Sequence, residues 1–223
     1  MNMSDSVATT ETGIPTVTTR RLVLRGFAEQ DAQPLWRILG EDGVLRYFPS
    51  SSPPALERVQ NMLARQLAHW KEYGYGRWAV VPRTEQTCIG WAGLEYLPEM
   101  NEAEVAYLLG KDYWGLGLAT EAALASVQYG FETVGLARIV GIVHVENGAS
   151  RRVLEKLGLS LLDQTHLWGM ECYRYSMARV SFGCKVAAKD DLPQCGSADY
   201  FLPWKVGRPL PTTRMSKLER RLR

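Results

Sequence analysis

Apolar residues recur at helical spacing in four stretches of the chain, and each stretch predicts a helix. The clearest of them has a single apolar stripe, formed by Leu56, Val59, Leu63, Leu67 and Trp70. We expect Ser52 to cap this helix and Gly74 to end it, because serine can accept from free N–H groups and glycine suits the left-handed helix end. The four helices are expected at residues 29–39, 52–74, 120–134 and 147–158.

Seven shorter stretches have the apolar pattern of β-strands. Three of them follow one another with short links between residues 76 and 110, which is typical of an antiparallel meander. Because helices then interrupt the strands, we expect an α+β fold with a mixed, mainly antiparallel sheet, one crossover and flanking helices. The strands are expected at Arg20–Phe27, Gly76–Pro82, Cys88–Leu97, Glu104–Gly110, Ala137–Val145, Leu159–His166 and Glu171–Val180.

The composition is that of an ordinary globular protein, with 46% hydrophobic and 22% charged residues in a chain of 223. It excludes disordered, collagen-like and coiled-coil proteins, and no stretch approaches the roughly 18 apolar residues of a membrane span. The first residues lack the basic start and apolar centre of a secretory signal, so we expect a cytoplasmic protein.

The cysteines and histidines give no sign of a metal site. Cys88, Cys172, Cys184 and Cys195 include no Cys-x-x-Cys pair, and the three histidines have no metal-binding spacing. We therefore expect no metal. Free thiols in a reducing compartment are the first interpretation, and a disulfide between Cys184 and Cys195 is the alternative.

Charge is distributed unevenly along the chain. The formal net charge is +2, yet residues 205–223 hold seven basic residues and one acid, so the rest is mildly acidic. This basic tail could cover the domain, join two copies into a homodimer, or touch the ribosome or RNA. In the last case binding would weaken with salt.

The stretch YWGLGLATEA, Tyr113–Ala122, runs from a glycine-rich turn into a predicted helix. A helix N-terminus presents unpaired N–H groups, and Gly115 and Gly117 carry no Cβ, so an anion can approach the backbone. Thr120 can add a hydroxyl and cap the helix. These features predict a pyrophosphate cradle, and a tight turn before a core helix is the alternative. A Walker loop is excluded because no Lys-Ser/Thr pair follows.

A second stretch, VHVENGASRRVLEKLG, places Asn147 at a strand exit and Ser150 in the first turn of a helix. With TTRRLVLRGF, CIGWAGL and AEVAYLLGKDYWGLGLATEA before it, it resembles the GNAT superfamily of acyl-CoA-dependent N-acetyltransferases, most closely the RimJ/RimL-like branch of ribosomal-protein N-terminal acetyltransferases. The resemblance implies the GNAT fold, whose central strands splay apart. It divides the chain into a flexible leader (1–17), the GNAT acetyltransferase domain (18–182) and a C-terminal extension (183–223).

The resemblance also implies where acetyl-CoA, the cosubstrate, would bind. The pantetheine arm would pair with the edge of strand Val105–Leu109, at Leu108 and Leu109, and contact Asn147, for which a helix cap or a turn is the alternative role. Ser150 would reach the cofactor from the following helix. Arg151 and Arg152 could meet the CoA phosphates, and a helix surface with Glu155 nearby is their alternative role. Trp114 departs from the Gln or Arg of the family pattern, which matters little if backbone amides hold the pyrophosphate. Those amides would belong to Leu116, Gly117, Leu118, Ala119 and Thr120.

The chemistry that the resemblance implies is direct attack of an amine on the thioester. Many relatives donate a proton to the leaving thiolate from a Tyr seven residues after the Asn, but here that residue is Leu154, so Ser150 is the substitute candidate. The alternative for Ser150 is a helix-start serine that is satisfied by the backbone. For the base, Glu104 begins the central strand and Glu95 ends the preceding one. The alternative for both carboxylates is a solvated surface group or a salt bridge.

We therefore expect an acetyl-CoA-dependent N-acetyltransferase that acts on a primary amine, either a protein N-terminal α-amine or a small-molecule amine. The alternative is a non-catalytic acyl-CoA-binding sensor or interaction module, which the missing Tyr keeps open. Aromatic residues are candidates for the wall of the acceptor pocket, namely Trp36, Phe48, Trp78, Trp91 and Tyr96.

Overall fold

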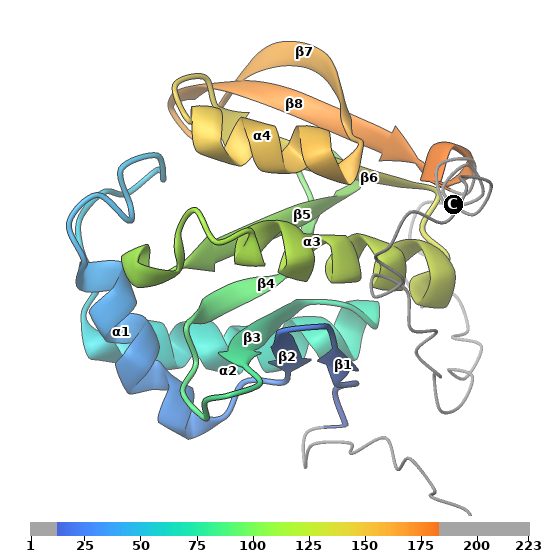
Figure 1. Cartoon of the computed structure of the whole chain (residues 1–223). Coiled ribbons are helices and arrows are strands. Elements are labelled where there is room, and N and C mark those ends of the chain that lie inside the picture. The colour runs from blue at the N-terminus through green and yellow to red at the C-terminus, as the bar shows by residue number, and fades with distance from the viewer. Residues whose placement is uncertain (1–12, 183–223) are drawn as a thin grey trace, which may run out of the picture.

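The computed structural model describes residues 13–182 and has one eight-stranded sheet at its centre (Figure 1). The strand order is β1-β2-β3-β4-β5-β6-β8-β7, and all neighbours are antiparallel except β5 and β6. The expected mixed, mainly antiparallel sheet is thereby confirmed. The strands are β1 (Val17–Thr18), β2 (Leu22–Arg25), β3 (Arg77–Pro82), β4 (Gly90–Leu97), β5 (Glu102–Leu109), β6 (Arg138–His144), β7 (Ser160–Leu167) and β8 (Met170–Ala178).

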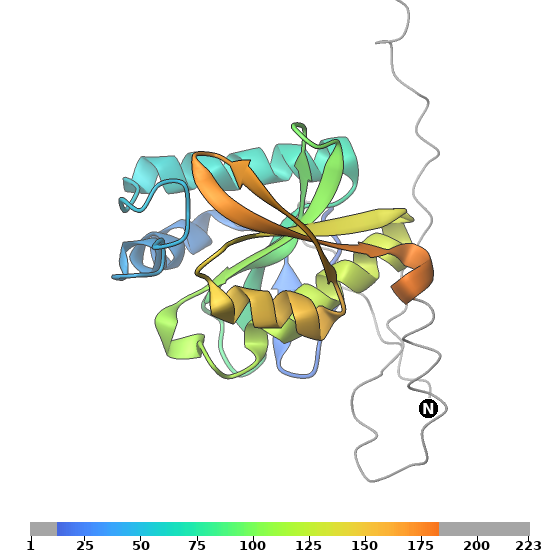
Figure 2. The ribbon, with the colours of Figure 1, turned by 90° about the horizontal axis from the view of Figure 1, so that it is seen from above.

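Helices cover both faces of the sheet. Figure 2 shows α1 and α2 on one side and α3 and α4 on the other, and each side has its own apolar core. Because β-strand side chains alternate between faces, the central strands β3, β4 and β5 contribute to both cores. The helices are α1 (Ala32–Gly40), α2 (Leu56–Tyr73), α3 (Leu118–Gln128) and α4 (Gly148–Leu157), with short turns η1 (Glu29–Asp31) and η2 (Lys111–Tyr113) and a π-helical continuation of α3, η3 (Tyr129–Val134).

The central strands β5 and β6 part almost as soon as they meet. Their parallel ladder has a single paired position, Glu104 with Val140. Just beyond it, the backbone N–H of Ile142 donates to the Glu104 side chain at 3.3 Å. The sheet therefore opens at Glu104, as the family resemblance implies.

Two helices begin at other residues than the sequence analysis expects. Ser52 does not cap α2, which starts at Leu56 with Ala55 in the capping position. The helix cannot start directly after Ser52, because Pro53 is followed by Pro54 and a residue before proline avoids helical geometry. Thr120 does not cap α3 either. That helix starts at Leu118 after Gly117, whose φ of 76° completes the preceding turn.

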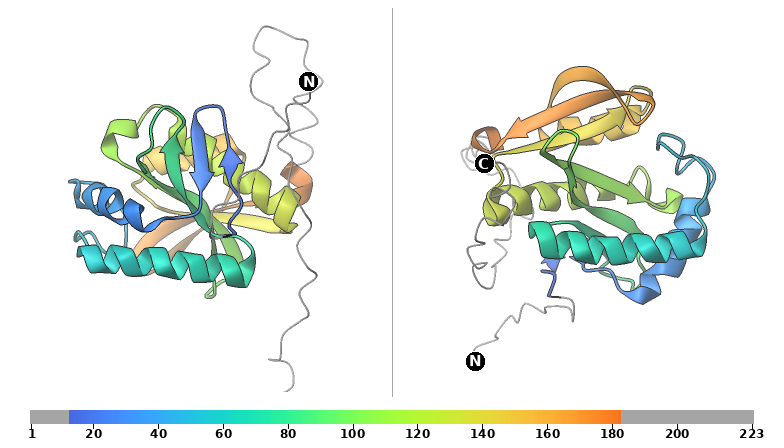
Figure 3. Two further views of the ribbon diagram at one scale, coloured as in Figure 1. Left: turned by 90° about the horizontal axis from the view of Figure 1, so that it is seen from below. Right: turned by 180° about the vertical axis from the view of Figure 1, so that it is seen from behind.

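The packed structure begins before the expected domain boundary at residue 18. Ile14 and Val17 are buried, and the Trp78 indole donates to the Pro15 carbonyl at 2.8 Å. β1 and β2 form a short hairpin beside β3 at the sheet edge (Figure 3). The basic tail, Cys184 and Cys195 lie outside the described residues. Cys88 and Cys172 are free thiols.

Gly93→Ala should destabilise the domain by about 3 kcal/mol or more. A Cβ at this position would lie 2.2 Å from the Gly76 carbonyl oxygen and 2.4 Å from Cα of Arg77, both backbone atoms of the paired strand. Chemical denaturation of the purified variant measures the loss. Gly40→Ala is the matched control, since a Cβ there meets nothing within 4 Å and the free energy of unfolding should stay within about 1 kcal/mol.

Candidate active site

A cavity of about 1000 Å³ extends through the opening between β5 and β6. Its lining comes from both strands, from the starts of α3 and α4, from the loop after α1 and from the β7–β8 turn. One end therefore reaches the glycine turn before α3. The other reaches a group of aromatic side chains.

The glycine turn bends twice through the left-handed region, at Gly115 (φ 75°) and Gly117 (φ 76°). A Cβ at Gly115 would meet nothing within 4 Å, and one at Gly117 would meet only an Arg21 nitrogen at 3.6 Å, so the backbone is open to an approaching group. Both glycines line the cavity with Ala119 and Thr120. Leu116 and Leu118 do not line it: the first side chain is exposed and the second is buried in the core.

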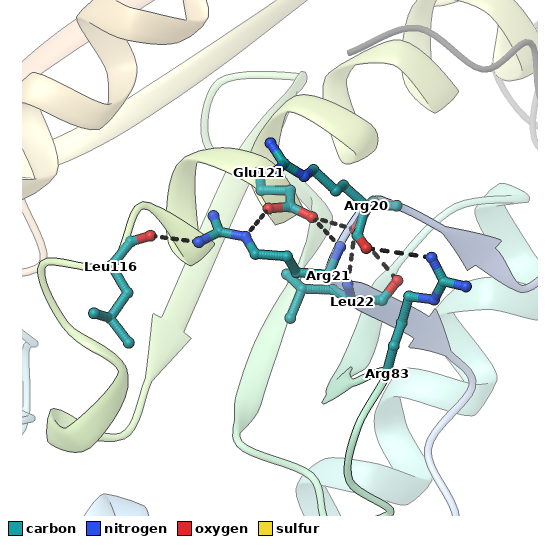
Figure 4. Close-up of polar contacts among 7 residues, drawn as sticks. Arg20, Arg21, Leu22, Arg83, Leu116 and Glu121 are labelled. Carbon is teal, nitrogen blue, oxygen red and sulfur yellow. Dashed lines mark hydrogen bonds and ion pairs between the residues drawn. The ribbon is translucent and has the colours of Figure 1, made fainter. Parts of the chain in front are cut away.

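Arg21 holds this turn from the N-terminal hairpin (Figure 4). Its Nη1 donates to the Leu116 carbonyl at 2.8 Å and its Nε to Glu121 at 2.7 Å. Glu121, in the first turn of α3, also accepts from Thr19 Oγ1 at 2.7 Å. Burial alone would raise the pKa of Glu121, but the hydrogen bonds from Thr19 and Arg21 outweigh it and hold that pKa below its usual value. The sequence analysis missed this anchor, which joins residues about 100 positions apart.

Asn147 and Ser150 stand at the start of α4, where both line the cavity. Asn147 caps the helix, since its side chain accepts from the Ser150 N–H at 3.1 Å. Arg152 also lines the cavity and is exposed. The alternative role predicted for Asn147, a helix cap, is therefore what the structure shows, and the cap places the Ser150 side chain at the cavity.

Tyr107 of β5 is a site residue that sequence reasoning did not single out. Its hydroxyl lies 2.9 Å from Ser150 Oγ and donates to the Ser150 carbonyl at 3.1 Å. Burial raises the pKa of this phenol well above its ordinary value, so it stays protonated. It lies in the strand whose edge was expected to hold the cofactor, and the neighbouring Leu108 and Leu109 also line the cavity.

Glu104 lies at the point where the strands part and is buried, with 9% of its surface exposed. Burial raises the pKa of this carboxyl to about 7, although the Arg77 charge and the Ile142 N–H act in the opposite direction. A carboxyl that titrates near neutral pH inside a cavity is suited to accepting a proton.

Glu95 faces the same side of the sheet but does not line the cavity. Its carboxylate accepts from Gln66 at 2.9 Å and forms an ion pair with Arg77 at 2.9 Å. The Arg77 guanidinium lies over the Trp91 ring, 4.2 Å from its centre. Glu95 is thus the salt-bridge partner that the sequence analysis gave as its alternative role.

Aromatic side chains surround the end of the cavity beyond Glu104. Of the five aromatic residues proposed from sequence, Phe48 and Trp91 line it, while Trp36, Trp78 and Tyr96 do not. Tyr47, His144 and Trp168 complete the group. Within residues 13–182, no cluster of three or more His, Cys, Asp or Glu side chains could hold a metal, and no helix is long and apolar enough to cross a membrane.

Comparison with known protein families identifies the family to which the chain belongs. Residues 21–160 match the model described as the acetyltransferase (GNAT) domain. The chain belongs to the GNAT acetyltransferase family. It is 32% identical over 145 residues to YoaA of Bacillus subtilis, an uncharacterized N-acetyltransferase, with 65% of this chain and 82% of YoaA covered. The family and its relatives support an N-acetyltransferase enzyme, so the non-catalytic alternative is not favoured.

Solved structures share the GNAT fold. An acetyltransferase from Agrobacterium tumefaciens superposes with a TM-score of 0.64 and 27% identity, covering 79% of this chain and 98% of that one. RimL, a ribosomal L7/L12 α-N-protein acetyltransferase solved with coenzyme A, gives a TM-score of 0.63 at 18% identity, covering 75% and 98%. At that identity the likeness shows the fold alone, so the RimJ/RimL-like branch stays a prediction.

Replacing Glu104 with Gln should change how stability depends on pH. In the wild type, the folded carboxyl holds its proton up to a pH of about 7 and the unfolded one only to about 4.5, so stability falls as pH rises between these values. Gln removes this loss. We therefore compare the free energy of unfolding of the variant with that of the wild type at each pH. This difference should be more favourable to the variant at pH 8 than at pH 4, by up to about 3 kcal/mol.

Denaturant unfolding at both pH values measures this difference, with the exposed Glu99→Gln as control. An equal effect of Glu104→Gln at pH 4 and pH 8 would contradict the assignment of a raised pKa.

Proposed function

We propose that this protein transfers the acetyl group of acetyl-CoA to a primary amine, on a protein N-terminus or a small molecule. The observation that carries the proposal is the position of Glu104, a buried carboxyl at the opening between β5 and β6. The cavity joins it to the glycine turn on one side and to the aromatic end on the other.

The residues on the α3–α4 side fit acetyl-CoA. The open backbone at Gly115 and Gly117, at the positive end of α3, suits a pyrophosphate. The β5 edge at Leu108 and Leu109 suits the peptide-like pantetheine arm, and Asn147 and Arg152 line the same passage. When bound there, acetyl-CoA supplies the activated thioester.

Glu104 serves as the base on the α1–α2 side. With a pKa of about 7 it is partly ionised at neutral pH and accepts the proton that an ammonium must lose before its nitrogen can attack. The neutral nitrogen then bonds to the thioester carbon and the C–S bond breaks. The second proton that the nitrogen loses goes to the leaving thiolate, so that the products are the N-acetyl amide and free CoA thiol. Glu95, held by Gln66 and Arg77, takes no part.

Ser150 and Tyr107 serve on the other side of the opening. Successive β5 side chains point to opposite faces, so Tyr107 lies across the strand from Glu104. In the proposed reaction the Tyr107 hydroxyl donates to Ser150 Oγ in place of the Ser150 carbonyl, which leaves the Ser150 hydroxyl hydrogen free to donate to the departing sulfur. Leu154, where many relatives have Tyr, is buried and has no polar group to offer.

Release of free thiol from acetyl-CoA in the presence of primary amines tests the proposal. Wild-type protein should release thiol with at least one amine, and Glu104→Gln should lower kcat/KM about 10²- to 10³-fold. The pH–rate profile of the wild type should rise through a pKa near 7, and the variant should lack this rise. Tight acetyl-CoA binding without release on any amine would favour a binding module instead.

Gly117→Val should abolish acetyl-CoA binding, because the side chain would lie where the pyrophosphate must approach the backbone. The substitution also strains a left-handed backbone position. Gly135→Val is the matched control, since φ there is 80° and it lies outside the cavity lining.

Calorimetric titration with acetyl-CoA should show lost binding in Gly117→Val and retained binding in Gly135→Val. Wild-type affinity in Gly117→Val would show that the cofactor lies elsewhere.

A further inference from the structure

The turn between β7 and β8 holds an aromatic residue in a conformation that aromatic residues rarely adopt. Leu167 pairs with Met170, so only Trp168 and Gly169 form the turn, with φ values of 53° and 80°. Two positive φ values define the type I′ turn, for which Asn-Gly and Asp-Gly are preferred. A bulky side chain there is strained, and such strain is concentrated at functional sites.

Packing within the domain covers only part of this tryptophan. Its side chain lines the cavity yet remains 43% exposed, and no hydrogen bond or ring contact engages it among residues 13–182. A large apolar surface that stays half open at the mouth of a cavity is suited to packing against a ligand.

Other rings face the same space from other elements. Figures 1 and 3 show the β7–β8 turn and the loop after α1 at the same end of the molecule. In that loop Tyr47 contacts the His144 ring with centroids 5.2 Å apart, and Phe48 meets Trp91 edge-on at 6.5 Å. Trp168 adds a further aromatic wall to this end of the cavity.

The charges at this end do not favour a polycation. The acids that line it are Glu104 and Asp42, and the basic residues Arg46 and Arg77 line it as well, although Arg77 is also ion-paired with Glu95. Of the two acids only Glu104 is buried, so this end of the cavity has one buried carboxyl for a single amine to reach. The walls beyond it offer aromatic faces.

We propose that the acceptor is a primary amine carried on an aromatic group, and that Trp168 determines this specificity by packing against the acceptor's ring while its amine reaches Glu104. Stacked or edge-to-face ring contacts would hold the acceptor's ring, and an ammonium passing the aromatic faces is attracted to them. This inference rests on the proposed function, since it names the substrate class of that site.

Trp168→Asn is the sharpest test because it separates folding from binding. It creates Asn-Gly, the sequence that this turn prefers, so the melting temperature should stay the same or rise. Removal of the ring should raise KM for 2-phenylethylamine about tenfold and leave KM for acetyl-CoA unchanged. Trp168→Phe keeps a ring and should restore most of the affinity.

Two comparisons complete the experiment. Leu161→Ala removes an exposed apolar side chain from the same hairpin, outside the cavity lining, and should change neither KM. Wild-type protein should prefer 2-phenylethylamine over spermidine and over a tetrapeptide with an N-terminal serine, and Trp168→Asn should lose that preference. Equal KM values for 2-phenylethylamine in wild type and Trp168→Asn, or preference for spermidine or the peptide, would overturn the inference.

Binding measurements distinguish this inference from the proposed function. If no amine releases thiol, titration of 2-phenylethylamine into the protein saturated with CoA still reports on Trp168. If the wild type binds 2-phenylethylamine and Trp168→Asn weakens this binding, the aromatic site is supported although the proposed transfer reaction is not. Binding that is absent or unchanged would overturn the site as well.

Discussion

The single paired position between β5 and β6 is the constraint on which the site depends. A continuous parallel ladder would bury the backbone groups of both strands and close the sheet. Here the ladder stops after Glu104 and Val140, and the Glu104 carboxyl accepts the Ile142 N–H instead. One side chain thus satisfies a backbone donor at the opening and introduces a titratable group there. The same opening allows one cavity to be lined from both faces of the sheet.

The two faces of the sheet present different groups at the opening. Strand alternation places Glu104 toward the α1–α2 side and Tyr107 toward the α3–α4 side, only three residues apart. A cosubstrate that approaches from the α3–α4 side and an amine that approaches from the α1–α2 side would meet at the gap. The glycine turn also depends on a residue that is distant in sequence, since Arg21, 95 residues before Leu116, donates to the Leu116 carbonyl.

Local patterns in the sequence predict most of the fold, because strand alternation, helical stripes and glycine ends are local properties. The sheet, the helices and the positions of Glu104, Asn147 and Ser150 at the cavity all follow from them or from the family resemblance. Sequence alone could not exclude Glu95 from the cavity, because its partners Gln66 and Arg77 lie on α2 and β3. Tyr107 was missed for the same reason, since only its contact with Ser150 marks it as more than a strand residue.

Trp168 shows how strain and specificity are connected. The hairpin would fold more easily with Asn in this position, because a type I′ turn needs positive φ at both central residues. Retaining a tryptophan there therefore costs some stability, while the packing of the domain leaves 43% of its surface exposed. In the specificity that we propose, a bound acceptor supplies the compensating contact, and the neighbouring rings and the buried Glu104 carboxyl of the cavity define its chemistry. Sequence patterns could not predict that Trp168 belongs to the site, because only the folded structure shows that the Trp-Gly turn lies beside the cavity.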